Sequence, residues 1–251
     1  MSGHSHWATV KRKKDVVDAK KGRVFSKIAK VITNAARQGG GDPASNAKLA
    51  YAIEQARAVN MPKDNIERAI KKGTGELEGA AQLVEQVYEA YGPGGVAILI
   101  DTITDNNNRT ASEIRNLLEN AGGSIGGTGS VNWMFDKKGL ILVEKNQADE
   151  DTLTEIALDS GAEDLALVGD AYQITSDPHD FSAVRKALEA HKIPIASAQL
   201  ASIPKTTCAV DEHTGRRVIS LLEKLEDHDD VQAVHSNAEF SEQLLAEMAR
   251  A

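Results

Sequence analysis

Cysteine, aromatic residues and long apolar runs are all scarce in this chain of 251 residues. The single cysteine, Cys208, excludes an internal disulfide and favours a reducing compartment. The longest apolar run, Val96 to Ile100, is far too short to span a bilayer. The first residues lack the apolar stretch of a signal peptide. Together these absences predict a cytoplasmic protein with no membrane segment.

Acidic residues are almost absent from the first 40 positions, although the whole chain has a formal net charge of -8. Positions 1–40 contain ten basic residues against Asp15 and Asp18, whereas the remaining positions sum to -16. Solubility does not require opposite charges to be placed in opposite parts of a chain. The asymmetry therefore predicts a polyanion partner for the N-terminal region. The acidic remainder would repel a wrapping polynucleotide, so it suits contact with a protein partner.

Helical periodicity dominates residues 1–80 and predicts a three-helix bundle. Asp42 and Pro43 have the pattern of an N-cap and first helical residue, and Gly73 that of a C-terminal cap. A linker rich in glycine and acidic residues follows. The apolar face expected on the first helix consists of Val24, Ile28, Val31 and Ala35.

The rest of the chain has the alternating strand and helix patterns of an α+β protein. Residues 138–204 follow the order strand, helix, strand, strand, helix, strand, which is that of a ferredoxin-like unit. The flanking segments 81–137 and 205–251 are each too small to bury a sheet alone. We therefore predict two α/β sandwich domains after the helical domain 1–80, with the ferredoxin-like domain 138–204 inserted into a discontinuous middle domain, 81–137 and 205–251.

Two local features are predicted within the middle domain. Thr110 and Glu113 are spaced as a capping box at the start of a helix. A strand is expected from about Ser130 to Phe135, before the ferredoxin-like unit begins.

The N-terminal basic cluster predicts a phosphate-binding surface. An ordinary solvated helix face interleaves acids with bases, and acids are too few here to do so. His4, His6 and Trp7 precede the cluster and can stack on bases or reach backbone oxygens, although packing of Trp7 on the bundle explains it equally well. The candidate nucleic-acid-binding residues are His4, His6, Trp7, Lys11, Arg12, Lys13, Lys14, Lys20, Lys21, Arg23, Lys27 and Lys30.

The sequence contains no pattern typical of a catalytic or cofactor site. In the glycine-rich stretch 122–129, Thr128 stands where a nucleotide-binding loop requires lysine, so a flexible connection explains it better. His4 and His6 have no nearby cysteine or carboxylate to complete a metal site. The asparagines of 105–110 are ordinary turn residues, although a polar site there is an alternative. We expect no enzymatic activity, no cofactor, no metal ion and no small-molecule substrate.

Several blocks of the sequence resemble the YebC/PmpR family, which includes the mitochondrial translational activator of cytochrome oxidase. The similar blocks are 2–25, 39–43, 88–95 (YEAYGPGG), 105–110 (DNNNRT) and 129–135 (GSVNWMF). They span essentially the whole chain. One departure is His6, at a position where the family commonly has lysine.

The resemblance implies three domains and one of two functions. Some members are described as DNA-binding transcriptional regulators, and others as ribosome-associated factors that ease translation of proline-rich stretches. DNA or ribosomal RNA would in either case be bound through the N-terminal domain. The residues themselves do not separate these two functions, because both require cations for phosphates.

Overall fold

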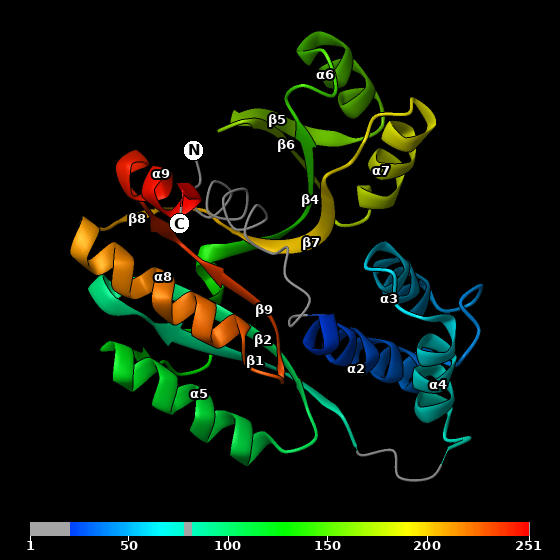
Figure 1. Ribbon diagram of the computed structural model, residues 1–251, viewed down its shortest axis with the longest axis horizontal. Coiled ribbons are helices and arrows are strands. Elements are labelled where there is room, and N and C mark those ends of the chain that lie inside the picture. The colour runs from blue at the N-terminus through cyan, green and yellow to red at the C-terminus, as the bar shows by residue number, and fades with distance from the viewer. Residues whose placement is uncertain (1–20, 78–81, 251) are drawn as a thin grey trace.

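The computed structural model describes residues 21–77 and 82–250, which form an α+β fold with three groups of elements (Figure 1). A helical bundle lies beside two sheets, and each sheet is covered by helices on one face. This arrangement confirms the predicted fold class. In the described ranges, no helix is both long and apolar enough to cross a bilayer.

Within the described residues, the N-terminal bundle contains three helices packed around a small apolar core. Leu49, Ala52 and Ala56 lie at its centre. Gly73 lies inside the third helix, where an added Cβ would come within 2.4 Å of the Thr33 carbonyl oxygen, so this glycine allows close helix packing. The left-handed residue that ends the helix is instead Gly75. The helices are α2 (Lys21–Gly39), α3 (Ala47–Ala58) and α4 (Lys63–Thr74).

Two local predictions for the bundle are wrong. The N-cap of α3 is Asn46, whose side chain accepts from the Leu49 amide at 3.1 Å, while Asp42 forms a separate turn before the helix. Asparagine and aspartate are equally good caps, so composition did not separate them. On α2, Val24 is exposed and Ile32 is completely buried. Ile28, Val31 and Ala35 pack in the bundle core as expected, so the predicted face is correct except at Val24.

The middle sheet has the strand order β3-β1-β2-β9 and draws strands from both sides of the ferredoxin-like unit. β9 pairs antiparallel with β2, with Leu99 opposite His235, which confirms a discontinuous middle domain. Helices α5 and α8 cover one face (Figure 1). The elements are β1 (Val84–Tyr91), the 3-10 helix η2 (Pro93–Gly95), β2 (Ala97–Thr104), α5 (Asn107–Ala121), β3 (Ser124–Ile125), α8 (Glu212–Glu226) and β9 (Val231–Ser236).

Three short elements complete the C-terminal part. The strands β8 (Cys208–Ala209) and β10 (Ala238–Glu239) form a separate parallel pair and do not join the main sheet. The sequence pattern of residues 207–210 predicts a strand that completes the main sheet, and this prediction is wrong. The helix α9 (Glu242–Arg250) packs its Leu244 and Leu245 into the core of the middle domain.

The second four-stranded sheet is antiparallel, with the order β5-β6-β4-β7. This order and the positions of its two helices confirm the ferredoxin-like unit. The elements are β4 (Phe135–Glu144), α6 (Glu150–Asp159), β5 (Ala162–Val168), β6 (Ala171–Ser176), α7 (Phe181–Ala190) and β7 (Ser197–Pro204).

The expected strand Ser130–Phe135 is wrong, because residues 132–134 form the 3-10 helix η3 (Asn132–Met134). β4 begins only at Phe135 and continues to Glu144 without a break. It therefore crosses the division that we proposed at residue 137. The boundaries 1–80, 81–137 with 205–251, and 138–204 remain our proposed division of the chain.

Candidate nucleic-acid interface and the Asp230 centre

The structure describes only part of the predicted nucleic-acid-binding set. The candidates between positions 4 and 20 lie outside the described residues, and Lys21 is described only as the first residue of α2. The remaining three, Arg23, Lys27 and Lys30, lie along α2. These three side chains can therefore be placed.

Arg23, Lys27 and Lys30 all contact the segment 226–230, which joins α8 to β9. Arg23 forms an ion pair with Asp227 at 2.9 Å, and the Lys27 ammonium donates to the Glu226 carbonyl. Lys30 donates to the Asp229 carbonyl at 3.0 Å and to Asp230 Oδ1 at 2.6 Å. Carbonyls at a helix C-terminus carry partial negative charge, so cations are stabilised there. The basic face of α2 thus holds the bundle against the middle domain.

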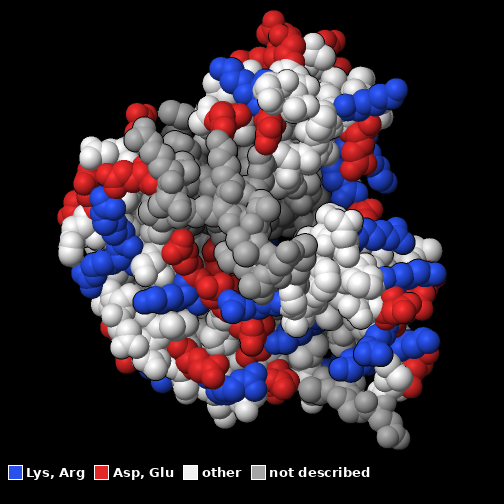
Figure 2. All heavy atoms as spheres, in the orientation of Figure 1, with Lys and Arg blue, Asp and Glu red and all other residues white. Residues whose placement is uncertain are grey.

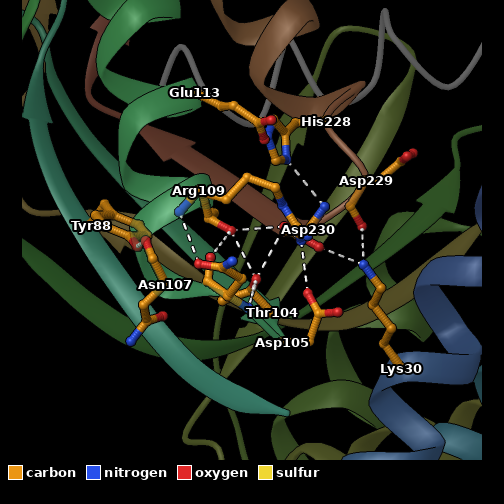
Figure 3. A network of polar contacts seen from close by, with 12 residues as sticks. Lys30, Tyr88, Thr104, Asp105, Asn107, Arg109, Glu113, His228, Asp229 and Asp230 are labelled. Atoms are coloured by element: carbon orange, nitrogen blue, oxygen red, sulfur yellow. Dashed lines mark hydrogen bonds and ion pairs between the residues drawn. The ribbon is translucent and has the colours of Figure 1, made fainter. Parts of the chain in front are cut away.

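Asp230 is the centre of a polar network contributed by α2, β2 and α5 (Figure 3). Its side chain is 3% exposed. In addition to Lys30 at Oδ1, Oδ2 accepts hydrogen bonds from Arg109 at 2.8 Å, Thr110 at 2.7 Å and Thr104 at 3.1 Å. The carboxylate is therefore buried with four donors.

The donors keep Asp230 ionised. Burial alone would raise the pKa of this carboxyl, but hydrogen bonds from Lys30, Arg109 and Thr110 hold it well below its ordinary value. The same contact with Asp230, together with Asp105 at 2.8 Å, raises the pKa of Arg109. The centre is thus a permanent charge network rather than a proton donor or acceptor near neutral pH.

The block 105–110 builds its side of this network through the start of α5. The N-cap is Asn106, whose side chain accepts from the Arg109 amide at 3.1 Å. The predicted capping box of Thr110 and Glu113 is therefore wrong. Thr110 is fully buried inside the first turn, where its hydroxyl binds Asp230. Sequence reasoning missed this role because the partner carboxylate lies 120 positions away.

Glu113, His228 and Asp230 place three possible metal-ligand atoms within 4.8 Å of one another (Figure 3). His228 Nδ1 accepts from the Asp230 amide at 3.1 Å, so Nε2 carries the proton and donates to Glu113 at 2.8 Å. Asp230 already binds two cationic side chains, which would repel a metal ion. These donors fit a hydrogen-bonded cluster better than a metal site.

A second buried carboxylate, Glu89 on β1, organises the glycine-rich stretch. Its two oxygens accept from the amides of Gly129 at 2.5 Å, Val131 at 2.7 Å and Asn132 at 2.8 Å. Burial raises the pKa of Glu89, but these amide hydrogen bonds outweigh it and the net pKa is lowered. Backbone amides grouped in this way can hold a phosphate. Here an internal carboxylate occupies three of them, which argues against a nucleotide site.

Two family models together match most of the chain. The model of the TACO1/YebC protein N-terminal domain matches residues 5–76, and that of the TACO1/YebC second and third domain matches residues 83–238. The chain belongs to the TACO1/YebC family. This confirms the resemblance seen in the sequence blocks.

Relatives of this TACO1/YebC chain match it over nearly its whole length. A protein of Desulfatibacillum aliphaticivorans named "Probable transcriptional regulatory protein" is 50% identical over 98% of this chain and 100% of its own. One of the same name from Pelotomaculum thermopropionicum is 51% identical over 96% of this chain and 100% of its own. The crystal structure of a conserved hypothetical protein from Aquifex aeolicus is 45% identical, with a TM-score of 0.82 over 90% of this chain and 93% of that one.

The described part of the TACO1/YebC N-terminal domain has an excess of basic over acidic residues. Residues 21–77 contain eleven basic and five acidic residues. In Figure 2, basic side chains outnumber acidic ones over the bundle at the right of the view. Six of the cations are exposed and form no ion pair with another described residue, and these are Arg37, Lys48, Arg57, Arg68, Lys71 and Lys72.

Replacing Glu89 by glutamine is expected to lower the free energy of unfolding by about 2 kcal/mol, because a buried amide nitrogen would face backbone N–H donors that lose their acceptor. Urea unfolding followed by circular dichroism measures the change. The matched control is Glu119→Gln, which removes an exposed carboxylate from the end of α5 and should change stability by less than about 0.5 kcal/mol. Equal effects of the two substitutions would contradict the role assigned to Glu89.

Proposed function

We propose that this chain is a non-catalytic, nucleic-acid-binding regulatory protein whose target is DNA. The observation that carries the proposal is the separation of charge, with ten basic residues against two acidic ones in positions 1–40 and a sum of -16 over the rest. Like charges held close together repel one another, and a phosphate backbone relieves that repulsion while counterions are released. The regulatory role is supported by the names of the relatives, which are called probable transcriptional regulatory proteins.

The contacts of the described cations divide them into two groups. Arg23, Lys27 and Lys30 are engaged by segment 226–230, so we assign them to holding the bundle on the middle domain. The candidates at positions 4–20 remain predicted phosphate contacts. We add the exposed, unpaired cations of α3 and α4 as contacts that extend the same surface.

We propose the absence of catalysis because of the ionisation and the hydrogen-bond partners of the buried carboxylates. A general acid or base needs a pKa near the working pH. It must also be free to form a hydrogen bond with the substrate group whose proton it transfers. Asp230 and Glu89 have lowered pKa values, and both are bound by donors of the protein itself. Hydrogen bonds within the protein therefore account for the lowered pKa values of both carboxylates, and a catalytic role is not needed to explain them.

Salt titration of the complete protein tests the proposal. Engaging about five phosphates predicts a slope of roughly -4 to -5 for log affinity against log salt on a 20-base-pair DNA duplex. Fluorescence anisotropy would compare this duplex with an RNA hairpin of equal phosphate number. We expect tighter binding to the duplex.

Two outcomes would contradict the proposal. A slope near zero on both polymers would show that the protein engages no phosphates of either one. Preference for the RNA, together with sedimentation of the cellular protein with ribosomes, would replace DNA by ribosomal RNA and make the chain a ribosome-associated translation factor.

A further inference from the structure

The block 129–135 takes no part in the proposed phosphate contacts, yet it exposes a large aromatic ring. Trp133 is 67% exposed, whereas its neighbours Val131 and Phe135 are buried against Ala97 and Leu99 of β2. The backbone thus turns two apolar residues inward and the largest one outward. Tryptophan exposed in this way is typical of binding surfaces, because it offers much contact area with few rotatable bonds.

The Trp133 ring is held in a defined position. Its indole Nε1 donates to the Ser130 carbonyl at 3.1 Å, and the hydroxyl of Tyr91 donates to the same oxygen at 3.0 Å. Tyr91 is itself 37% exposed, so two aromatic side chains flank one carbonyl at the surface. Glu89 fixes the backbone beneath them through its three amide contacts. A side chain that is already ordered loses little entropy when a ligand binds.

We propose that Trp133 stacks on an unpaired base of the bound nucleic acid, an inference that rests on the proposed function. The indole N–H is already satisfied inside the protein, so the ring presents an apolar face that suits a flat partner. A base of any identity has such a face, and stacking on it does not require a specific sequence.

The surroundings of Trp133 favour a base over a protein partner. Protein interfaces have an apolar core of several residues and bury more than about 1,000 Å². The exposed residues adjoining Trp133 in the loop are polar or lack a side chain, and they are Gly127, Thr128, Gly129, Asn132, Asp136 and Lys137. Apart from Tyr91, the Trp133 ring is surrounded by polar residues, and so small an apolar surface fits one stacked group.

Fluorescence of the complete protein tests the stacking. Trp7 and Trp133 are the two tryptophans of the chain, and Trp7 is itself a candidate contact, so it is left in place. The difference in emission between the unsubstituted protein and Trp133→Phe then isolates the signal of Trp133. Binding of a single-stranded oligothymidylate should quench its emission, whereas an abasic strand of equal length should not. Trp133→Ala should weaken oligothymidylate binding about tenfold, and Trp133→Phe should keep most of the affinity.

The salt dependence separates this inference from the proposed function. Stacking releases no counterions, so Trp133→Ala should leave the slope against salt unchanged. The matched control is Leu200→Ala on β7, where a 49% exposed apolar residue should be replaced without effect on binding. The stacking would be overturned if oligothymidylate left the Trp133 emission unquenched and Trp133→Ala kept the affinity and the salt slope of the unsubstituted protein. Phosphate binding would then remain intact. Failure of the unsubstituted protein to bind any strand would overturn both.

Discussion

Replacing Lys11, Arg12, Lys13 and Lys14 together by glutamate is expected to flatten the salt dependence of nucleic-acid binding from a slope of roughly -4 to -5 nearly to zero. Four of about five phosphate contacts would be lost, and the new acids would repel the backbone. Binding to DNA and to structured RNA should weaken alike, because phosphate contacts position a protein without specifying sequence. Anisotropy titrations across a range of salt concentrations measure the effect.

A matched quadruple substitution distinguishes local phosphate contacts from total charge. The second four-stranded sheet and its two helices, with the loops between them, carry four exposed lysines without a described ion-pair partner, Lys137, Lys145, Lys186 and Lys192. Changing these four to glutamate alters net charge equally and should leave the slope close to that of the unsubstituted protein. An unaltered slope in a folded N-terminal variant would show that the basic cluster does not contact the phosphates of the nucleic acid. The search would then move to Arg109 and Arg115.

Asp230→Asn is expected to lower the free energy of unfolding at neutral pH by about 2–4 kcal/mol. The substitution leaves Lys30 and Arg109 without their shared counterion and brings an amide N–H₂ group against donors. Thr104 and Thr110 also lose a buried acceptor. Denaturant unfolding at pH 7 measures the change. The control is Asp229→Asn, an adjacent exposed carboxylate with the same charge change, which should cost less than about 0.5 kcal/mol.

The pH dependence of this effect has a definite sign. The pKa of Asp230 is lowered in the folded protein. Its contribution to the free energy of unfolding is therefore fully present above the ordinary aspartate pKa of about 3.9. The contribution is lost as the pH falls below that value toward the lower folded-state pKa. The stability difference between the unsubstituted protein and Asp230→Asn should therefore shrink between about pH 4 and pH 2. A difference that grows in acid would show that Asp230 is not the stabilising anion.

The sequence by itself determined the elements that depend on short-range periodicity. The apolar spacing of residues 181–190 predicts a helix, and α7 has those limits in the structure. The strand and helix order of the ferredoxin-like unit is also as predicted. Side chains alternate with period two on strands and 3.6 on helices, so both patterns can be recognised within a dozen residues. The separation of charge between positions 1–40 and the rest is likewise a property of composition alone.

Only the tertiary structure decided which polar groups meet. Thr110 has the spacing of a capping residue, yet its hydroxyl binds Asp230 in the interior of the protein. Asp230 itself lies in an acidic segment whose composition is typical of a solvent-exposed loop. Arg23, Lys27 and Lys30 form a basic helix face in the sequence, but their partners in 226–230 lie about 200 positions away. Such pairs follow from how β9 joins β2 and how α2 docks beside it. Periodicity records which face a residue occupies, but it does not record which distant segment covers that face.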